Sequence, residues 1–188
     1  SFVPTRDIFN HAESFLFDKT GAFLKDYRTN NDTYRFLDYK QLYIARDGER
    51  GIKIIYGGAG TGKTVVLIHR LKYLLMHFSH VERILFVTFN AALARFIENI
   101  MSVESILPSD KTIHVRYFYE LCAGIVPKPD TSQPFDAYYR MVKKALDAEP
   151  TLLTPYDAVF VDEGQDFGPL EYEIITRFLN PSSADFMC

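Results

Sequence analysis

The sequence has few cysteines, no long apolar run and no excess of positive charge, and each absence excludes a class of protein. Two cysteines, Cys122 and Cys188, cannot form a disulfide framework, so we expect a reducing, cytoplasmic setting. Apolar runs such as 84–86 are far shorter than the ~20 residues of a membrane helix, and we expect no contact with a membrane. The 21 Lys and Arg residues against 24 Asp and Glu give a net charge of -3, so the charge balance does not indicate a strongly basic nucleic-acid-binding protein. A local basic groove is still compatible with this balance.

The composition is that of a folded, compact protein. Hydrophobic residues make up 47% of the 188 residues and charged residues 24%, which excludes wholesale disorder and favours one domain with a small appendage. The first residue is Ser1 rather than Met, and no signal-peptide pattern follows it. We therefore expect the chain to be an excised piece of a longer gene product.

The pattern of apolar and polar residues changes near residue 51. Before it, helical segments at 5–17 and 33–45 are joined by polar turns, and we interpret 1–37 as a helical N-terminal extension. After it, short apolar runs alternate with segments of helical period, which is typical of parallel βα units. The expected strands are 52–56, 83–89, 112–115, 158–162 and 185–188. The pattern predicts an α/β domain over 38–188, with its site at the carboxyl ends of the strands.

Apolar stripes at spacings of three and four residues define the helices between these strands. The first stripe comprises Leu67, Ile68, Leu71, Leu74, Leu75 and Phe78. Asn90 is the expected N-cap of the next helix. The stripe of that helix comprises Leu93, Phe96, Ile97, Ile100 and Met101. Further helices are predicted near Phe118 and over 135–146, and we expect Phe118 and Cys122 to be buried core residues.

A glycine-rich loop follows the first predicted strand and leads into a helix. It matches the pattern G-x-x-x-x-G-K-[ST] without a gap, in the order Gly57, Gly58, Ala59, Gly60, Thr61, Gly62, Lys63, Thr64. Glycines free the backbone to wrap an anion with N–H groups, and the following helix presents its positive end to phosphates. Lys63 is expected to reach the β- and γ-phosphates of ATP, and the Thr64 hydroxyl to bind Mg²⁺.

A second candidate site follows the strand at 158–162. Asp162 is expected to hold Mg²⁺, and Glu163 to activate the attacking water as general base. Gln165 lies within reach of the γ-phosphate region. Taken alone, this segment is typical of a solvated acidic turn; a phosphate loop elsewhere in the chain gives the acids a function.

These motifs resemble those of the UvrD/Rep-like superfamily 1 helicases. Residues 162–166 read Asp-Glu-Gly-Gln-Asp, and Gly164 replaces the alanine that is usual in the family's second motif. Gln41, sixteen residues before Gly57, resembles the glutamine that reads the adenine edge. Residues 87–94 are similar to a motif that touches single-stranded DNA, and 115–121 are similar to a later motif, although Tyr117 and Tyr119 replace the usual Thr and His.

The resemblance implies a RecA-like P-loop NTPase domain, truncated before the family's third motif, that uses ATP and Mg²⁺ and moves along single-stranded DNA, with RNA left open. Its nucleic-acid contacts would come from Thr88, Phe89, Asn90 and Tyr117. A second RecA-like domain, outside this chain, would supply a catalytic arginine, so we expect this chain alone to hydrolyse ATP poorly.

The sequence leaves two other interpretations of the phosphate loop open: a P-loop kinase with a small-molecule acceptor, and a nucleotide-gated interaction module without helicase activity. A further pattern, His77-x-x-His80, is the spacing of two metal ligands, but it has no cysteine or acidic partner at a fitting spacing. We interpret it as a solvated helix end.

Overall fold

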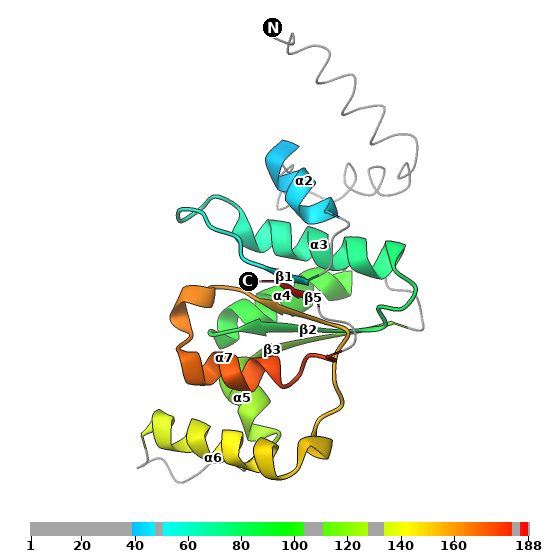
Figure 1. Cartoon of the computed structure of the whole chain (residues 1–188). Coiled ribbons are helices and arrows are strands. Elements are labelled where there is room, and N and C mark those ends of the chain that lie inside the picture. The colour runs from blue at the N-terminus through cyan, green and yellow to red at the C-terminus, as the bar shows by residue number, and fades with distance from the viewer. Residues whose placement is uncertain (1–38, 48–50, 104–110, 128–133, 182–184, 188) are drawn as a thin grey trace, which may run out of the picture. The chain divides into compact units, whose positions relative to one another are not determined.

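The computed structural model describes residues 39–47, 51–103, 111–127, 134–181 and 185–187, and Figure 1 shows their arrangement. The chain divides into two compact units, 1–37 and 38–188. The first unit, and with it the predicted helical extension, lies outside the described residues. The described helices and strands therefore all belong to the second unit.

The second unit is built on a five-stranded sheet in which all pairings are parallel, as the sequence predicts. The strands lie in the order β1-β5-β4-β2-β3. Their bounds are β1 Gly51–Lys53, β2 Arg83–Thr88, β3 Thr112–Tyr117, β4 Ala158–Val161 and β5 Asp185–Met187. Strand β1 ends earlier than expected and β3 runs further, to Tyr117. The fold is that of a RecA-like α/β P-loop domain.

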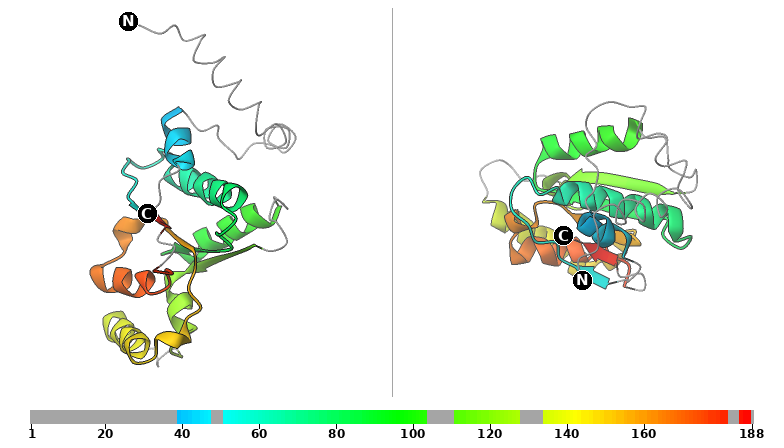
Figure 2. Two further views of the ribbon diagram at one scale, coloured as in Figure 1. Left: turned by 45° about the vertical axis from the view of Figure 1, so that its right-hand side comes forward. Right: turned by 90° about the horizontal axis from the view of Figure 1, so that it is seen from above.

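Helices flank the sheet on both sides. They are α2 Tyr39–Arg46, α3 Lys63–His77, α4 Ala91–Val103, α5 Phe118–Ala123, α6 Phe135–Ala148 and α7 Pro169–Thr176, with short 3-10 turns η1 Pro150–Leu152 and η2 Gly164–Asp166. Figure 1 and the left view of Figure 2 show α3 on one side of the sheet and α5, α6 and α7 on the other. No helix in the described part of the chain is both long and apolar enough to cross a membrane.

The central strands are apolar because they are covered on both faces. Every residue of β4 is buried, and in β2 every residue from Ile84 to Thr88 is buried. The rings of Phe86 and Phe160, which are partners in the β2–β4 register, stack with centroids 6.1 Å apart. The predicted core residues Phe118 and Cys122 are also buried, and burial raises the pKa of the Cys122 thiol to about 12, so this cysteine is protonated at neutral pH.

The two predicted apolar stripes differ in how fully they are buried. In α3 the stripe from Leu67 to Leu75 is buried. In α4 Ile97 and Ile100 are buried, but Phe96 is 48% exposed, so its assignment to the core is wrong. Ala94, which is 4% exposed, faces the core instead. The face around Ile97 lies about 100° away from Phe96 on the helix, because successive residues are rotated by that angle.

The predicted N-cap of α4 is confirmed. The Asn90 Oδ1 atom accepts hydrogen bonds from the backbone N–H groups of Ala92 at 2.7 Å and Leu93 at 3.3 Å. These are two of the N–H groups that a helix start leaves without an internal partner. The cap fixes the point where the chain turns from β2 into α4.

Substitution of two neighbouring α4 residues tests which face of the helix meets the core. Ile97→Ala is expected to lower the free energy of unfolding by about 2–5 kcal/mol, because it leaves a cavity at a site with no exposed surface. Phe96→Ala is expected to cost less than about 1 kcal/mol. Urea denaturation measures both, and equal losses would contradict the assigned helix face.

Candidate nucleotide-binding site

The glycine-rich loop leads from the end of β1 into the first turn of α3. Two of its glycines have left-handed backbone conformations, Gly60 with φ 74° and Gly62 with φ 86°. Gly62 is the N-cap of α3, and its carbonyl accepts the first helical bond from Val66 N at 3.0 Å. Residues with a Cβ rarely adopt these angles, so the glycines are needed where the backbone curves back before the helix.

Lys63 lies across this loop. Its Nζ donates to the carbonyls of Gly57 at 3.0 Å and Gly58 at 3.1 Å. The Thr61 hydroxyl also donates to Gly58 O, at 2.9 Å, so the loop is held by its own polar groups. An ammonium group binds charged phosphate oxygens more strongly than neutral carbonyls, so the loop offers a cation that an anion can capture. These residues fit a bound phosphate chain.

Gln41 on α2 contacts the same loop from outside the βαβ unit. Its Nε2 donates to Thr61 O at 2.7 Å. The structure therefore places Gln41 at the phosphate loop, as part of the same site. Its expected contact with the adenine edge stays a prediction.

The acidic strand end meets the loop at Thr64. The Thr64 hydroxyl donates to Asp162 Oδ2 at 2.7 Å, although the two residues lie 98 positions apart in the sequence. Asp162 Oδ1 accepts from the N–H of Glu163 at 3.0 Å. The Asp162 side chain is almost fully buried, and burial raises its pKa above the usual 3.8; the hydrogen bonds from Thr64 and Glu163 act in the opposite direction. The structure thus brings the two predicted metal ligands into direct contact.

The chemistry of this pair fits Mg²⁺. A hydroxyl and a carboxylate oxygen are hard ligands, and Mg²⁺ in nucleotide sites takes few protein ligands and the rest from phosphate and water. Among the described residues no group of three or more His, Cys, Asp or Glu side chains is placed to hold a metal by itself. A metal at Thr64 and Asp162 would take its remaining ligands from phosphate oxygens and water. His77 is the last residue of α3 and His80 follows the helix; both are exposed, as expected of a solvated helix end.

The predicted base and glutamine lie on the turn after β4. Glu163 has a left-handed backbone with φ 54°, and it is half-buried. The Gln165 amide Nε2 donates to Glu163 Oε2 at 2.6 Å. The structure brings these two side chains together, but the roles predicted for them are not tested by it.

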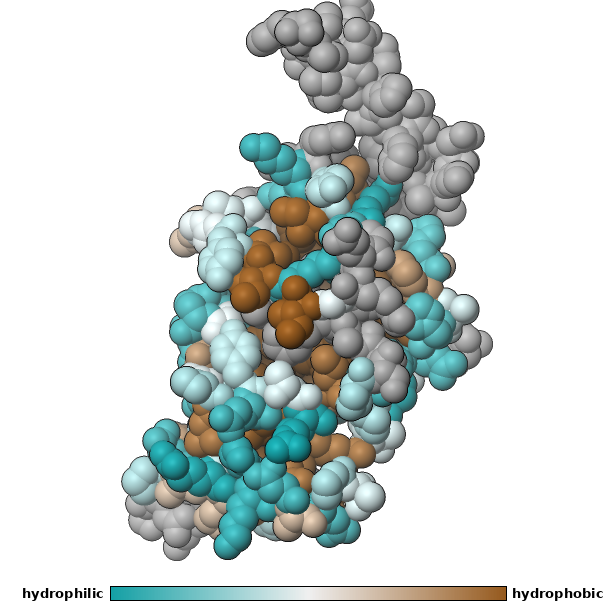
Figure 3. All heavy atoms as spheres, viewed as in Figure 1, coloured by the Kyte–Doolittle hydropathy of each residue, from teal (hydrophilic) through white to brown (hydrophobic). Residues whose placement is uncertain are grey.

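The loop and the acidic turn border one cavity of about 560 Å³. Its lining includes Lys63, Asp162, Glu163 and Gln165, together with apolar side chains of β1 and of the segment that follows it. Ile52 and Ile54 are 77% and 55% exposed, and Figure 3 shows an apolar patch on this face of the molecule. Polar groups that converge beside an apolar wall are typical of ligand sites.

Sequence reasoning missed Tyr172, which lines this cavity from α7. Its hydroxyl donates to Gly164 O, inside the acidic turn, at 2.8 Å. The residue lies ten positions after Asp162 in a helix without a recognised motif. No signal in the sequence alone distinguishes it from the other aromatic residues.

The predicted nucleic-acid contacts fall at the carboxyl ends of β2 and β3, where Thr88 and Tyr117 are paired in register. Thr88 has no exposed surface, and its hydroxyl donates to Asn90 O at 2.9 Å, so the side chain holds the turn here; its contact with nucleic acid stays a prediction. Phe89 is 49% exposed and its ring meets Phe167 edge-on at 5.5 Å. Tyr117 is half-buried, and for Phe89, Asn90 and Tyr117 the contact stays a prediction.

Fold and site together define a nucleotide-binding P-loop domain: a phosphate loop between a parallel strand and a helix, facing an acidic strand end. A family model described as an AAA domain matches residues 41–187, and the chain belongs to this P-loop NTPase-like family. The matched segment includes every residue of the site, from Gln41 to Gln165. A search of curated proteins found no match.

Removal of the Lys63 ammonium tests the phosphate loop. Lys63→Ala is expected to weaken ADP binding by about 100-fold, because two charge-assisted hydrogen bonds are worth roughly 3 kcal/mol. Titration calorimetry measures the dissociation constant. Lys144→Ala, at an exposed position of α6, is the control and should bind like the unsubstituted chain. Unchanged affinity in Lys63→Ala would refute the assigned loop.

Burial of the Asp162 carboxylate predicts the direction in which Mg²⁺-dependent ADP binding changes with pH. Because the pKa of Asp162 is raised, the Mg²⁺-dependent part of ADP affinity is expected to be present at neutral pH and to be lost as the pH falls, beginning above 3.8. Asp162→Asn should abolish the Mg²⁺ dependence, yet be at least as stable as the unsubstituted chain without metal, since no charge is then buried. Calorimetry across pH and thermal unfolding measure both. Loss of stability together with retained Mg²⁺ dependence would contradict the assignment.

Proposed function

We propose that this chain is the first ATP-binding motor domain of a UvrD/Rep-like superfamily 1 helicase, which couples ATP hydrolysis to movement along single-stranded nucleic acid. The observation that carries the proposal is the Thr64–Asp162 contact, which joins the phosphate loop to the acidic strand end. The family match supports nucleotide binding and hydrolysis, and the motifs at 41, 87–94, 115–121 and 162–166 support the narrower assignment.

The residues divide the chemistry between them. Backbone N–H groups of 58–64 and the Lys63 ammonium bind the phosphates, and Lys63 stabilises the charge that develops on the γ-phosphate. Thr64 and Asp162 would hold Mg²⁺, which would neutralise part of the negative charge of the phosphates. Glu163 orients the attacking water and accepts its proton, and Gln165 holds the Glu163 carboxylate in place.

The nucleic-acid strand is proposed to lie over the ends of β2 and β3. The half-exposed ring of Phe89 and the ring of Tyr117, whose centroid lies 6.4 Å from that of Tyr119, offer flat surfaces on which bases stack. Arg116 lies beside them, although Glu98 Oε1 at 3.2 Å and Glu120 Oε1 at 3.8 Å offset its charge. The affinity of this surface should therefore come mainly from stacking and depend less on salt than that of a basic groove.

The resemblance also implies a partner: a second RecA-like domain, whose arginine completes the catalytic site and whose opening and closing drive each step. Strand separation is accordingly proposed for the two domains together.

The decisive assay is the binding and ATPase response to single strands. We expect Phe89→Ala to weaken binding of a fluorescent single-stranded DNA or RNA by roughly 5- to 100-fold, the loss of one stacked base. Phe96→Ala removes a ring of nearly equal exposure from α4, 48% against 49%, and is the matched control. Fluorescence anisotropy measures the dissociation constants.

Other outcomes would favour the rival interpretations. Equal affinities for the two variants would remove the proposed surface. No effect of either nucleic acid on the ATPase rate of the full-length protein, together with ATP-dependent capture of a protein partner, would favour a nucleotide-gated interaction module. A phosphorylated small-molecule product would favour a kinase.

A further inference from the structure

The hydroxyl of Tyr172 is bonded to the centre of the turn that carries the proposed base. It donates to Gly164 O at 2.8 Å, from the first turns of α7. Gly164 lies between Glu163 and Gln165, and its carbonyl belongs to the Gly164–Gln165 peptide unit. The bond from Tyr172 therefore fixes the backbone between the two residues. Tyr172 also lines the cavity that Lys63 and Asp162 border.

This turn needs such a support because its backbone is strained. Glu163 has φ 54° and ψ 45°, and within the described residues it is the one non-glycine residue with positive φ. A residue with a Cβ stays in that region only where its surroundings hold it there. The inner bonds of the turn are Asp166 N to Glu163 O at 2.9 Å and Phe167 N to Gly164 O at 3.3 Å. The second of these is long for a hydrogen bond, so Tyr172 makes the shorter contact to Gly164 O.

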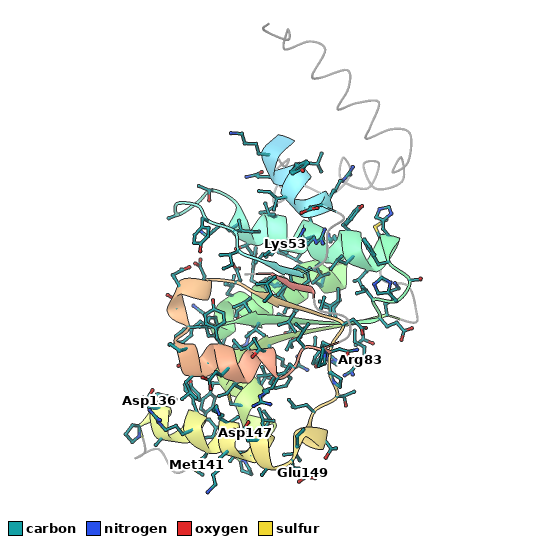
Figure 4. All side chains as sticks on the ribbon, in the orientation of Figure 1. Lys53, Arg83, Asp136, Met141, Asp147 and Glu149 are labelled. Carbon is teal, nitrogen blue, oxygen red and sulfur yellow. The ribbon has the colours of Figure 1, made fainter. Side chains whose placement is uncertain are left out.

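The support itself is firmly placed. Helix α7 starts at Pro169, and its Ile174 and Ile175 have no exposed surface. At its end Arg177 Nη2 donates to Asp147 Oδ1 of α6 at 2.5 Å; Figure 4 labels Asp147 on α6. A functional turn is held more accurately when the side chain that positions it stands on a helix packed against the core.

We propose that Tyr172 is a positioning residue for ATP hydrolysis: its hydroxyl holds the Gly164–Gln165 peptide and thereby sets the orientation of the Glu163 carboxylate and of the Gln165 amide bound to it. This inference rests on the proposed function. In this role Tyr172 touches no reacting atom. Its effect is on the geometry of water activation, where small misplacements slow a reaction strongly.

The ring and the hydroxyl of Tyr172 have separable contacts. The ring packs against Phe167 with centroids 6.0 Å apart, and phenylalanine retains that packing. Tyr172→Phe therefore removes the hydroxyl that donates to Gly164 O and keeps the ring. Tyr138→Phe, on α6, is the matched control. The Tyr138 hydroxyl also donates to a backbone carbonyl, that of Val126, at 3.0 Å. Both variants lose a tyrosine hydroxyl that donates to a backbone carbonyl.

The experiment compares four forms of the 188-residue chain: unsubstituted, Tyr172→Phe, Tyr138→Phe and Glu163→Gln. Single-turnover hydrolysis of Mg·ATP gives the rate of the chemical step, and calorimetry gives nucleotide affinity. We expect Tyr172→Phe to hydrolyse about tenfold more slowly with affinity within about twofold, a change in rate without a change in binding. Tyr138→Phe should keep the rate of the unsubstituted chain.

A second measurement reports on the turn without catalysis. Amide hydrogen exchange at Asp166 and Phe167 reports the two inner bonds of the turn. Exchange there should be faster in Tyr172→Phe by about tenfold and unchanged in Tyr138→Phe.

The outcomes separate the inference from the proposed function. If Glu163→Gln hydrolyses as fast as the unsubstituted chain, the proposed role of Glu163 fails, whatever Tyr172 does. If Glu163→Gln is slow but Tyr172→Phe matches Tyr138→Phe in rate, the inference is overturned. Loss of affinity in parallel with rate, or equal exchange in the two tyrosine variants, would also overturn it, since Tyr172 would then be a structural residue only.

Discussion

The hydrogen bond between the Thr64 hydroxyl and Asp162 Oδ2 is the contact on which the site depends. It joins the first turn of α3 to the end of β4, and these elements come from opposite ends of the matched domain. Parallel strands bring their carboxyl ends to one edge of the sheet, so loops that are distant in sequence face each other there. The phosphate loop and the acids form one site because of this arrangement and because β5 alone separates β1 from β4.

The same site is costly to the folded protein. Asp162 carries a carboxylate into a buried position, which raises its pKa, and Glu163 adopts a backbone that residues with a Cβ avoid. Both features are expected at a catalytic site. A poorly solvated carboxylate attracts a cation, and a fixed turn holds the side chains that act on the developing charge. The surrounding structure offsets this cost through the buried strands β2 and β4 and through α7. Asp162 and Glu163 both line the cavity, and apolar side chains line it beside them.

The sequence predicts much of this arrangement where a physical rule acts locally. Strands β2 and β4 are continuous apolar runs, the loop 57–64 is defined by its glycines, and Asn90 caps α4 because its side chain reaches two N–H groups of the first helical turn. Local rules fail where tertiary placement decides burial. Phe96 is apolar yet 48% exposed on α4. Tyr172 acts through a contact with a turn eight residues earlier, and only folding brings them together.

A structure of the chain with Mg²⁺ and ADP tests the central claim most directly. We predict that the β-phosphate lies among the N–H groups of 58–64, that Lys63 Nζ leaves the carbonyls of Gly57 and Gly58 for it, and that the metal contacts the Thr64 hydroxyl on the Asp162 side. A nucleotide bound elsewhere, or a loop in which Lys63 still donates to those two carbonyls, would contradict it.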